Sequence, residues 1–375
     1  MKYNFKEDHL GAEFCKETIV AIKKLINASI SFTVVGMPGL GISIFLRYVA
    51  TQPFSYFVHV DVYELSKLTR FELVKLLLKE LGTHSSSKNY EQLLKACQKG
   101  LEDLVKTHKR VVIIFNRFDQ LHKEFDISFF NNLRTLRDVD REKIVMVFAA
   151  NKPLYMFAPQ AIDKGNLNMY SKTLYLPPYS PQDLRRLLIL NAPELTKDKA
   201  SLEKALKLAG GHYQLLQLLL KSERLENPLL DYFIKAQLKI LYDYLNYNQR
   251  KVVQIIALKK KVNNGDNYLM DVGLVVKRAH NYHLFTPLLA EFVKSNIPLR
   301  LPVKEAWLFR LLKKNLGKVV TKDEIYEAVW PEDPVEASEW ALNALVYRLR
   351  RNPTFAQQGY IIENHKKVGY VMIKT

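Results

Sequence analysis

The chain has 375 residues, which is too many for one ordinary domain and predicts two to four domains. A content of 48% hydrophobic and 25% charged residues is typical of a globular protein with apolar cores. The formal net charge of +18 is unusual for that class. It favours a polyanionic partner, nucleic acid or an acidic membrane face, over a merely solvated lysine-rich surface.

The cysteines and the amino terminus narrow the class of protein further. Cys15 and Cys97 lie far apart and lack metal-ligand spacing, so we expect reduced thiols, an intracellular protein and no metal site. The first ten residues contain no apolar signal core. The uncharged stretch 25–46 contains Asn, Ser, Thr, Gly and Pro, which argue against a membrane span. We therefore expect a cytoplasmic protein without a membrane partner.

Strand-like and helical patterns alternate over the first part of the chain. Strands are expected at 31–35, 56–62, 110–115 and 143–149, and helices at 11–29, 42–51, 69–82, 89–107 and 126–137. The third and fourth strands are continuous apolar runs, as strands buried on both faces should be. This order of elements predicts a parallel sheet in a three-layer α/β domain.

After about residue 178 the patterns become helical. Helices are expected at 180–191, 198–210, 212–222 and 228–262, and later at 303–314, 322–329 and 335–351. Thr321 and Glu324 form a capping-box pattern before the second of the last three helices. A hairpin closed by Gly369-Tyr370 follows, so the last unit reads as a winged helix-turn-helix.

The stretch GMPGLGIS, residues 36–43, lies between the first expected strand and the next helix. It matches the phosphate-loop pattern G-x-x-x-x-G-K-[ST], except that Ile42 stands where the pattern has lysine. Such a loop binds phosphate through backbone N–H groups at the positive end of a helix. The expected phosphate-binding residues are Gly36, Gly39, Gly41 and Ser43. The flanking strand and helix favour a phosphate-loop origin over a chance glycine-rich turn.

The other half of such a site lies at the end of another strand. There an acidic residue normally holds magnesium through water, and a glutamate after it polarises the attacking water. In this chain the apolar run 111–115 ends in Asn116 and Arg117, and Asp119 comes three residues too late. The lysine, the metal-holding acid and the catalytic base are thus all missing. We therefore expect no ATP hydrolysis and no catalytic residues.

Residues 5–296 resemble the AAA+ and STAND class of P-loop ATPases, in the branch near archaeal replication initiators. The resemblance rests on GMPGLGIS, on VVIIFNRFDQL, on LPPYSPQDL at the lid entrance, and on Asn151 after the strand ending FAA. The turn 210–213 matches the family's Gly-Gly-x-Pro, except that Tyr213 replaces proline. Arg185 and Arg186 lie a helix too early to supply the family's lid arginine.

The resemblance implies an AAA+-like body with an all-α lid. It makes Asn151 the polar sensor of the γ-phosphate, and we add Asn116 to the residues expected at the nucleotide site. No cofactor is required, and ATP or ADP would bind only weakly through the loop. Assembly with itself, or with another AAA+-like subunit that completes the active site, is an open alternative.

Residues 299–375 resemble the OmpR/PhoB-type effector domain of response regulators. The resemblance rests on VVTKDEIYEAVW, on RLRR at 348–351, and on VGY at 368–370. Two features depart from the family. At most 299–301 could supply a strand of its amino-terminal sheet, and Lys366-Lys367 replace an Arg-Gly pair in the wing. The resemblance implies that helix 335–351 lies in the major groove of double-stranded DNA.

Leu342, Leu345 and Leu349 are expected to form the buried stripe of that helix, opposite its DNA-reading face. The residues expected to contact DNA are Asn343, Tyr347, Arg348, Arg350 and Arg351 on the helix, and His365, Lys366 and Lys367 on the wing. The alternative is that the arginines only make salt bridges, for instance with Glu336 or Glu339.

The middle of the chain resembles the winged helix that follows the lid in this ATPase class. Its basic clusters, 259–261 and 277–278, could form a second DNA contact or only a solvated face. We thus expect an α/β domain over 1–177, a helical lid over 178–239, a winged-helix module over 240–297 and the DNA-binding winged helix over 298–375. The leading interpretation is a regulator of transcription; a partner-completed ATPase switch and a protein-assembly scaffold are the alternatives.

Overall fold

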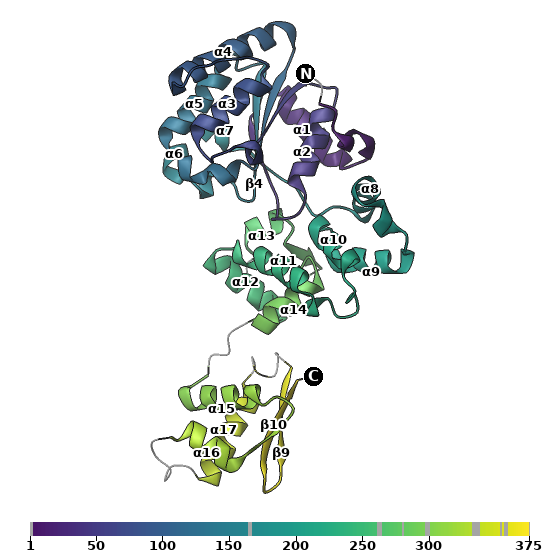
Figure 1. Cartoon of the computed structure of the whole chain (residues 1–375), viewed down its shortest axis with the longest axis vertical. Coiled ribbons are helices and arrows are strands. Elements are labelled where there is room, and N and C mark those ends of the chain that lie inside the picture. The colour runs from purple at the N-terminus through teal and green to yellow at the C-terminus, as the bar shows by residue number, and fades with distance from the viewer. Residues whose placement is uncertain are drawn as a thin grey trace. The chain divides into compact units, whose positions relative to one another are not determined.

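The protein was analysed as a computed structural model of the chain (Figure 1). The structure describes residues 3–163, 167–260, 265–279, 281–296, 301–331, 338–352, 355 and 359–374. The chain forms two compact units, one made of residues 1–249 and 264–288 and the other of residues 250–263 and 289–375. Among the described residues, no helix has the length and apolar character that crossing a membrane would require.

The first unit is built on a five-stranded sheet in the order β2-β3-β4-β1-β5. Its strands are β1 (Phe32–Val35), β2 (Tyr56–Asp61), β3 (Val111–Asn116), β4 (Ile144–Ala150) and β5 (Thr173–Tyr175). All neighbouring strands are parallel. Every residue of β1, β3 and β4 is buried, because helices cover both faces of the sheet. The predicted parallel sheet is confirmed.

Helices lie on both faces of this sheet, as Figure 1 shows. One face carries α1 (Lys16–Asn27) and α2 (Ile42–Thr51); the other carries α3 (Arg70–Glu80), α4 (Tyr90–Thr107), α5 (Ile127–Arg137), α6 (Pro159–Asp163) and α7 (Leu167–Tyr170). Four short 3-10 helices lie before or between these helices and strands: η1 (Lys6–Leu10), η2 (Val62–Glu64), η3 (Phe118–Glu124) and η4 (Leu154–Met156). A large apolar core fills the space between the sheet and α3, α4 and α5. The three-layer α/β architecture is therefore confirmed.

A helical segment follows the sheet. It contains α8 (Pro181–Asn191), η5 (Pro193–Thr196), α9 (Lys199–Ala209), α10 (Tyr213–Lys221), η6 (Pro228–Leu230), α11 (Tyr232–Asp243) and α12 (Tyr247–Ala257). The stretch 228–262, expected to be helical, is divided among η6, α11 and α12, and α11 ends at Asp243. Asn246 and Gln249 then exchange side-chain bonds with each other's backbone N–H groups, at 3.0 and 2.9 Å, and start a new helix. The remaining stretch, 178–239, has no strands, as expected for the lid.

The chain next forms α13 (Asn267–Asp271), the antiparallel hairpin of β6 (Val275–Arg278) and β7 (Asn281–Leu284), and α14 (Pro287–Asn296). Lys277 and Arg278 lie on the exposed end of β6. Lys260, which follows α12, is also exposed, and Lys261 is outside the described residues. That residues 240–297 form a separate winged-helix module stays a prediction, as do the four domain limits.

The carboxyl-terminal residues form a winged helix with its own apolar core. Its elements are α15 (Val303–Lys314), β8 (Val319–Thr321), α16 (Lys322–Val329), α17 (Glu339–Arg351), β9 (Tyr360–His365) and β10 (Gly369–Lys374). The three strands pair antiparallel in the order β8-β10-β9. The expected capping box of Thr321 and Glu324 is present, and Ser338 caps α17.

Two details of this winged helix differ from the expectation. Helix α17 begins at Glu339, four residues after the predicted start, and residues 335–337 lie outside the described part of the chain. Strand β8 was not expected, and it explains Gly369: a Cβ there would lie 1.9 Å from the carbonyl oxygen of Val320. Leu301 is not in a strand, and 299–300 are not among the described residues.

Candidate functional site

The phosphate-type loop has the backbone path that the sequence predicted. Strand β1 ends at Val35 and α2 begins at Ile42. Between them Gly39 and Gly41 have φ angles of 82° and 108°, a left-handed region that glycine adopts without strain. The carbonyl of Gly41 accepts hydrogen bonds from the N–H groups of the first helical turn, at 3.0 and 3.1 Å. The loop therefore leads directly into a helix amino terminus, where a phosphate would bind.

Ile42 occupies the position of the missing lysine. Its Cγ1 and Cδ1 atoms lie only 3.3 Å from the place that a Cβ on Gly36 would take. The side chain is thus folded back on the start of the loop and is half-buried there. It contributes apolar packing to the loop and no charge to a phosphate.

The hydroxyl that would bind magnesium is tied into a chain of hydrogen bonds. Ser43 Oγ donates to Asn116 Oδ1 at 3.0 Å, and Asn116 Nδ2 donates to Asp61 Oδ2 at 2.9 Å. Arg117 pairs with the same Asp61 carboxylate, and its guanidinium lies 3.9 Å from the ring centre of Tyr63. Asn116 is fully buried at the end of β3. The groups at the usual metal position therefore satisfy one another.

Asn151, expected as the sensor of the γ-phosphate, is held by Asp119. Its backbone N–H and its Nδ2 donate to Asp119 Oδ2 at 3.0 and 3.1 Å. Burial raises the pKa of Asp119, while these hydrogen bonds act in the opposite direction. The hydroxyl of Tyr268 donates to the carbonyl of Asn151 at 2.7 Å. Asp119 thus fixes Asn151 at the edge of the sheet.

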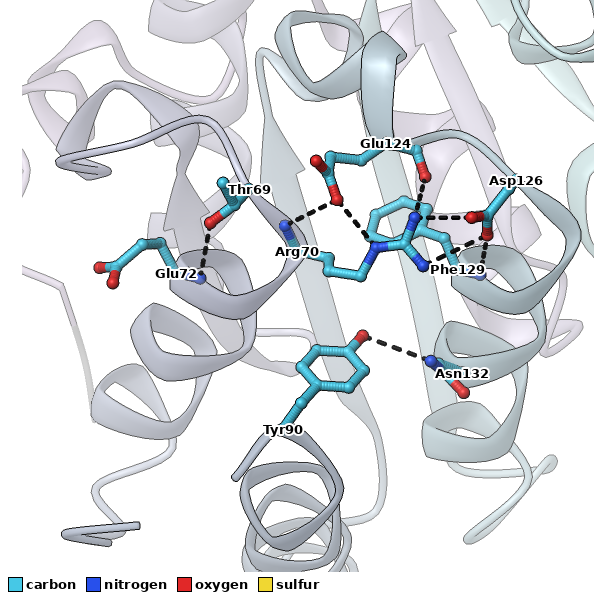
Figure 2. Close-up of polar contacts among 8 residues, drawn as sticks. All are labelled: Thr69, Arg70, Glu72, Tyr90, Glu124, Asp126, Phe129 and Asn132. Carbon is cyan, nitrogen blue, oxygen red and sulfur yellow. Dashed lines mark hydrogen bonds and ion pairs between the residues drawn. The ribbon is translucent and has the colours of Figure 1, made fainter. Parts of the chain in front are cut away.

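The segment that follows Asn116 is anchored at its far end by Arg70, as Figure 2 shows. Arg70 Nε donates to Glu124 at 2.8 Å and Arg70 NH2 to Asp126 at 2.7 Å. The Arg70 guanidinium also lies over the ring of Phe129, 5.6 Å from its centre. This cluster joins the start of α3 to the end of η3 and the start of α5. This cluster could not be predicted from local patterns, because the three partners are more than fifty residues from Arg70.

The helical segment contacts the loop directly. His212 Nε2 lies 2.9 Å from the carbonyl oxygen of Pro38, and Gln237 Nε2 donates to the same oxygen at 3.1 Å. The backbone N–H of Gln214 donates to the carbonyl of Gly39 at 3.1 Å. These contacts were not predicted; the only signal was the turn Gly210-Gly211, which places His212 at the start of α10.

The contacts of His212 define its protonation state. The N–H of Leu215 donates to Nδ1 at 3.1 Å, so Nε2 carries the hydrogen and donates to Pro38. Complete burial lowers the pKa of His212 to about 4. The imidazole is therefore neutral near pH 7 and serves as a hydrogen-bond bridge between loop and helix.

A pocket of about 500 Å³ opens beside the loop. It is lined by Met37, Pro38, Gly39, Gly41, Ile42, Ser43, Ile44, Arg47, Tyr63, Asn116, Arg117, Asp119, Gln120, Ala149, Ala150, Asn151, Tyr213, Gln214 and Gln217. Its two arginines are paired: Arg117 with Asp61, and Arg47 with the buried Glu7 at 2.8 Å. The six residues predicted for the nucleotide site thus lie together. Five of them line the pocket, and Gly36 lies against the side chain of Ile42.

No group of three or more His, Cys, Asp or Glu side chains in the described ranges is arranged to hold a metal ion. The pocket can offer backbone N–H groups, amides and paired guanidinium groups to a ligand. It offers neither a lysine nor a carboxylate at the positions that phosphoryl transfer uses.

The second candidate site is the outward face of α17. Leu342, Leu345, Val346 and Leu349 are buried in the core of the winged helix. On the opposite side the side chain of Tyr347 is 55% exposed, and the guanidinium of Arg351 lies 5.0 Å from the centre of its ring. Trp340 is 80% exposed on the same side. Trp340 was not predicted, although its spacing of seven residues from Tyr347 was a usable signal.

Three of the expected DNA-contacting side chains bond within the winged helix itself. Arg348 Nε donates to the buried Glu305 at 3.0 Å, from α17 to α15. Arg350 donates through Nε and NH2 to the carbonyl of Ile362 on β9, at 3.0 and 2.7 Å. The hydroxyl of Tyr370 donates to Asn343 Oδ1 at 2.5 Å. These contacts brace the helix against α15 and the wing.

The alternative, that the arginines of α17 make salt bridges, holds for Arg348, but its partner is not one of the two expected glutamates. Arg348 pairs with Glu305, whereas Glu339 pairs with Lys322. Glu336 lies outside the described residues.

The wing turn presents three basic side chains. His365, Lys366 and Lys367 are exposed between β9 and β10. Lys367 has a φ of 64°, so it adopts the left-handed conformation for which the family has glycine. The N–H of Val368 closes the turn on the carbonyl of His365 at 3.0 Å. The Lys366-Lys367 replacement therefore keeps a tight turn and adds positive charge to it.

Comparisons with known proteins place the two parts of the chain. Residues 296–372 match the family model described as "Transcriptional regulatory protein, C terminal". No curated protein sequence matches the chain. The body has the expected parallel sheet, the glycine loop after β1 and the strand-free segment that follows.

Several solved structures are similar to the chain at low sequence identity. A Walker-type ATPase of Pyrococcus abyssi is 15% identical, with 78% of this chain and 98% of that chain covered and a TM-score of 0.48. The Aeropyrum pernix ORC1 protein in complex with DNA is 12% identical, with 99% and 94% covered and a TM-score of 0.42. The Thermotoga maritima RuvB Holliday junction branch migration motor is 14% identical, with 76% and 96% covered and a TM-score of 0.33.

These findings separate the two parts of the chain. A parallel α/β domain and a helical segment occupy the first part, and a winged helix lies near the carboxyl terminus. The family match over residues 296–372 coincides with this winged helix.

Proposed function

We propose that this protein is a DNA-binding regulator of transcription whose AAA+/STAND-like body does not hydrolyse ATP. The observation that carries the proposal is the family match of residues 296–372, the DNA-binding part of transcriptional regulators. In the proposed complex α17 lies in the major groove and the wing turn follows the phosphates. Arg351 and Lys366-Lys367 are exposed where that placement needs positive charge. The net charge of +18 adds long-range attraction to DNA.

The lack of hydrolysis is proposed from three positions. Ile42 packs on the loop, Asn116 is committed to Ser43 and Asp61, and Arg117 stands where a base would polarise water. Loss of one such group lowers a rate by roughly two to three orders of magnitude, and three losses remove most of the electrostatic stabilisation. The body would then act as a structural or assembly module.

DNA binding is tested by enriching duplexes from a random-sequence pool on the full chain. Their affinity is then measured by fluorescence anisotropy, with and without ATP and Mg²⁺. We expect sequence-preferring binding that survives without nucleotide and weakens with rising salt. An Arg351→Ala, Lys366→Ala variant, which removes two exposed charges from the proposed DNA-binding face, should weaken binding strongly. Lys95→Ala, Lys99→Ala on exposed positions of α4 removes the same charge and serves as the matched control.

Hydrolysis is tested by steady phosphate release with ATP, Mg²⁺ and the enriched duplex. We expect equal background rates for the wild type and for Ser43→Ala. Steady turnover that Ser43→Ala or Gly41→Ala abolishes would refute this half of the proposal.

A nucleotide-dependent switch is the second candidate function, favoured by the retained loop and its pocket. Gly39 and Gly41 keep the left-handed geometry of a phosphate loop, beside about 500 Å³ of open space. Under this candidate ATP or ADP binds through backbone groups, or a partner subunit completes the site. It requires measurable nucleotide affinity and a change in DNA affinity when nucleotide is present. A pure assembly scaffold would instead tolerate charge reversal at Arg351, which is exposed and does not brace the winged helix.

A further inference from the structure

We propose that α17 recognises thymine-rich DNA, by packing an aromatic stripe against thymine methyl groups in the major groove. The aromatic stripe consists of Trp340, Ala344 and Tyr347, with Arg351 at its end. This inference rests on the proposed DNA-binding function and names the base that the same site prefers.

The stripe is defined by helix geometry. Its members are spaced by four, three and four residues, so they fall on one face of α17. Leu342, Leu345 and Leu349 form the opposite face, which packs in the core. Trp340 is 80% exposed, the most exposed of the large apolar side chains in the described part of the chain. A large aromatic surface thus points away from the core at the place where a recognition helix meets DNA.

Three of the groups expected to contact DNA by hydrogen bonds are used within the winged helix. Arg350 donates twice to the carbonyl of Ile362, and Arg348 donates to Glu305. Asn343 accepts a bond from Tyr370, so only its Nδ2 hydrogens are left for a base. Bidentate pairing of arginine with guanine, or of asparagine with adenine, therefore requires breaking contacts that brace α17. Apolar packing on the stripe breaks none of them.

The chemistry of the major groove then selects the base. Thymine is the base that presents a methyl group there, and apolar side chains recognise it by contact. Burying exposed aromatic surface against methyl groups is favourable because it removes apolar area from water. Guanine and cytosine present no methyl group in the major groove, so they gain less from apolar packing against the stripe. The stripe therefore favours duplexes with thymines under α17.

Charge around the stripe favours DNA over a protein partner. The guanidinium of Arg351 lies over the ring of Tyr347, 5.0 Å from the centre of that ring. His365, Lys366 and Lys367 provide further exposed basic side chains on the wing of the same unit. An aromatic surface accompanied by exposed cations suits a polyanion that carries apolar methyl groups.

The experiment compares thymine with uracil, which differ only in that methyl group. Duplexes enriched from a random-sequence pool are resynthesised with deoxyuridine in place of thymidine, and both forms are titrated against the full chain. We expect the wild type to lose roughly three- to fivefold in affinity for each thymine that the stripe contacts. Trp340→Ala should bind the thymine duplex more weakly and should no longer distinguish it from the uracil duplex.

The controls separate the stripe from general effects. Val303→Ala changes another exposed apolar side chain of the same winged helix and should keep the wild-type preference for thymine. Thermal unfolding of each variant shows whether the winged helix is intact. Tyr347→Phe keeps the ring and should also keep the preference.

The outcomes distinguish the inference from the proposed function. Equal affinity of the wild type for both duplexes overturns the inference and leaves DNA binding in place. Equal losses of Trp340→Ala on both duplexes assign Trp340 to the sugar-phosphate backbone and also overturn it. If no duplex is enriched or bound, both the proposed function and the inference fail, and the stripe becomes a surface for a protein partner.

Discussion

The hydroxyl of Ser43 donates a hydrogen bond of 3.0 Å to Oδ1 of Asn116. In a working phosphate-loop site a magnesium ion lies between the corresponding hydroxyl and acid. Here the two side chains contact each other without an intermediate, and Asn116 passes the contact on to Asp61. The neutral amide can both accept from Ser43 and donate to Asp61, which a carboxylate at this position could not do. The substitution therefore gives the site a structural role.

Asn116→Ala should lower the free energy of unfolding of the body by about 1–3 kcal/mol, because it leaves buried polar groups without a partner. Ser43→Ala should cost less, since Asn116 keeps its bond to Asp61 and Ser43 is only half-buried. Urea titration followed by circular dichroism gives both values. A larger loss for Ser43→Ala than for Asn116→Ala would contradict the proposed chain of hydrogen bonds.

Gly39→Ala should loosen the contact between the loop and the helical segment. A Cβ at Gly39 would lie 2.4 Å from Gln214 Oε1, 2.8 Å from Gln237 Nε2 and 2.9 Å from His212 Cε1. Gly41→Ala is the matched control: its φ is also positive, but its Cβ would meet nothing closer than 3.5 Å.

Both alanines carry the strain of a positive φ, and Gly41 lies farther from the left-handed minimum, so a lower stability of Gly39→Ala reports the lost contact. We expect Gly39→Ala to be the less stable of the two by about 1 kcal/mol or more. Proteolysis between α9 and α11 should also be faster in that variant. Equal melting temperatures would show that the helical segment can move aside without cost.

Stability of the body should fall as the pH falls from about 6.5 to 4. Burial lowers the pKa of both His212 and His59 to about 4, while the unfolded chain takes up these protons near pH 6.5. In this window the unfolded state binds more protons than the folded state, so lowering the pH favours unfolding. Between pH 7 and pH 5 each histidine should account for a loss of about 2 kcal/mol.

His212→Gln isolates one of the two histidines. Glutamine does not titrate but can still donate to Pro38, so this variant should show about half of the pH-dependent loss. Urea midpoints at pH 7 and pH 5 give the comparison. If wild type and variant lose stability in parallel, His212 is not a buried neutral group.

Much of this architecture could be predicted from patterns that are local in the sequence. The apolar runs of β3 and β4 and the glycine loop before α2 were sufficient for the parallel sheet and the phosphate-type site. Strand β5 was missed because its three residues are too short to show alternation, and it is defined only by pairing with β1. Strand β8 was missed for the same reason, since Val319–Thr321 pairs with β10.

In the candidate sites, too, local motifs could be predicted and contacts between distant segments could not. The loss of lysine and acid at Ile42 and Asn116 could be predicted because each occupies a fixed place in a motif. The bonds of Pro38 to His212 and Gln237 could not, since they join residues that lie more than 170 positions apart. On α17 the helical period predicted the buried leucines. It could not show that Arg348 and Arg350 bond to α15 and β9, because those partners come from other elements.

The arginines of α17 should therefore differ in what their removal affects. Arg348→Ala should lower the melting temperature of the winged helix, because it leaves the buried carboxylate of Glu305 without its partner. Arg351→Ala should leave the melting temperature within about a degree, since its side chain lies on the surface over Tyr347.

In DNA titrations the order of the two variants should reverse, at a salt concentration where both are folded. Arg351→Ala should weaken binding and reduce the slope of log affinity against log salt by about one, as expected for a lost phosphate contact. Restoring only the charge with Arg351→Lys should recover the slope, whereas a Glu305→Gln, Arg348→Ala pair should recover the stability. A fall in melting temperature for Arg351→Ala, with no change in DNA affinity, would assign Arg351 to the fold and remove it from the DNA-binding face.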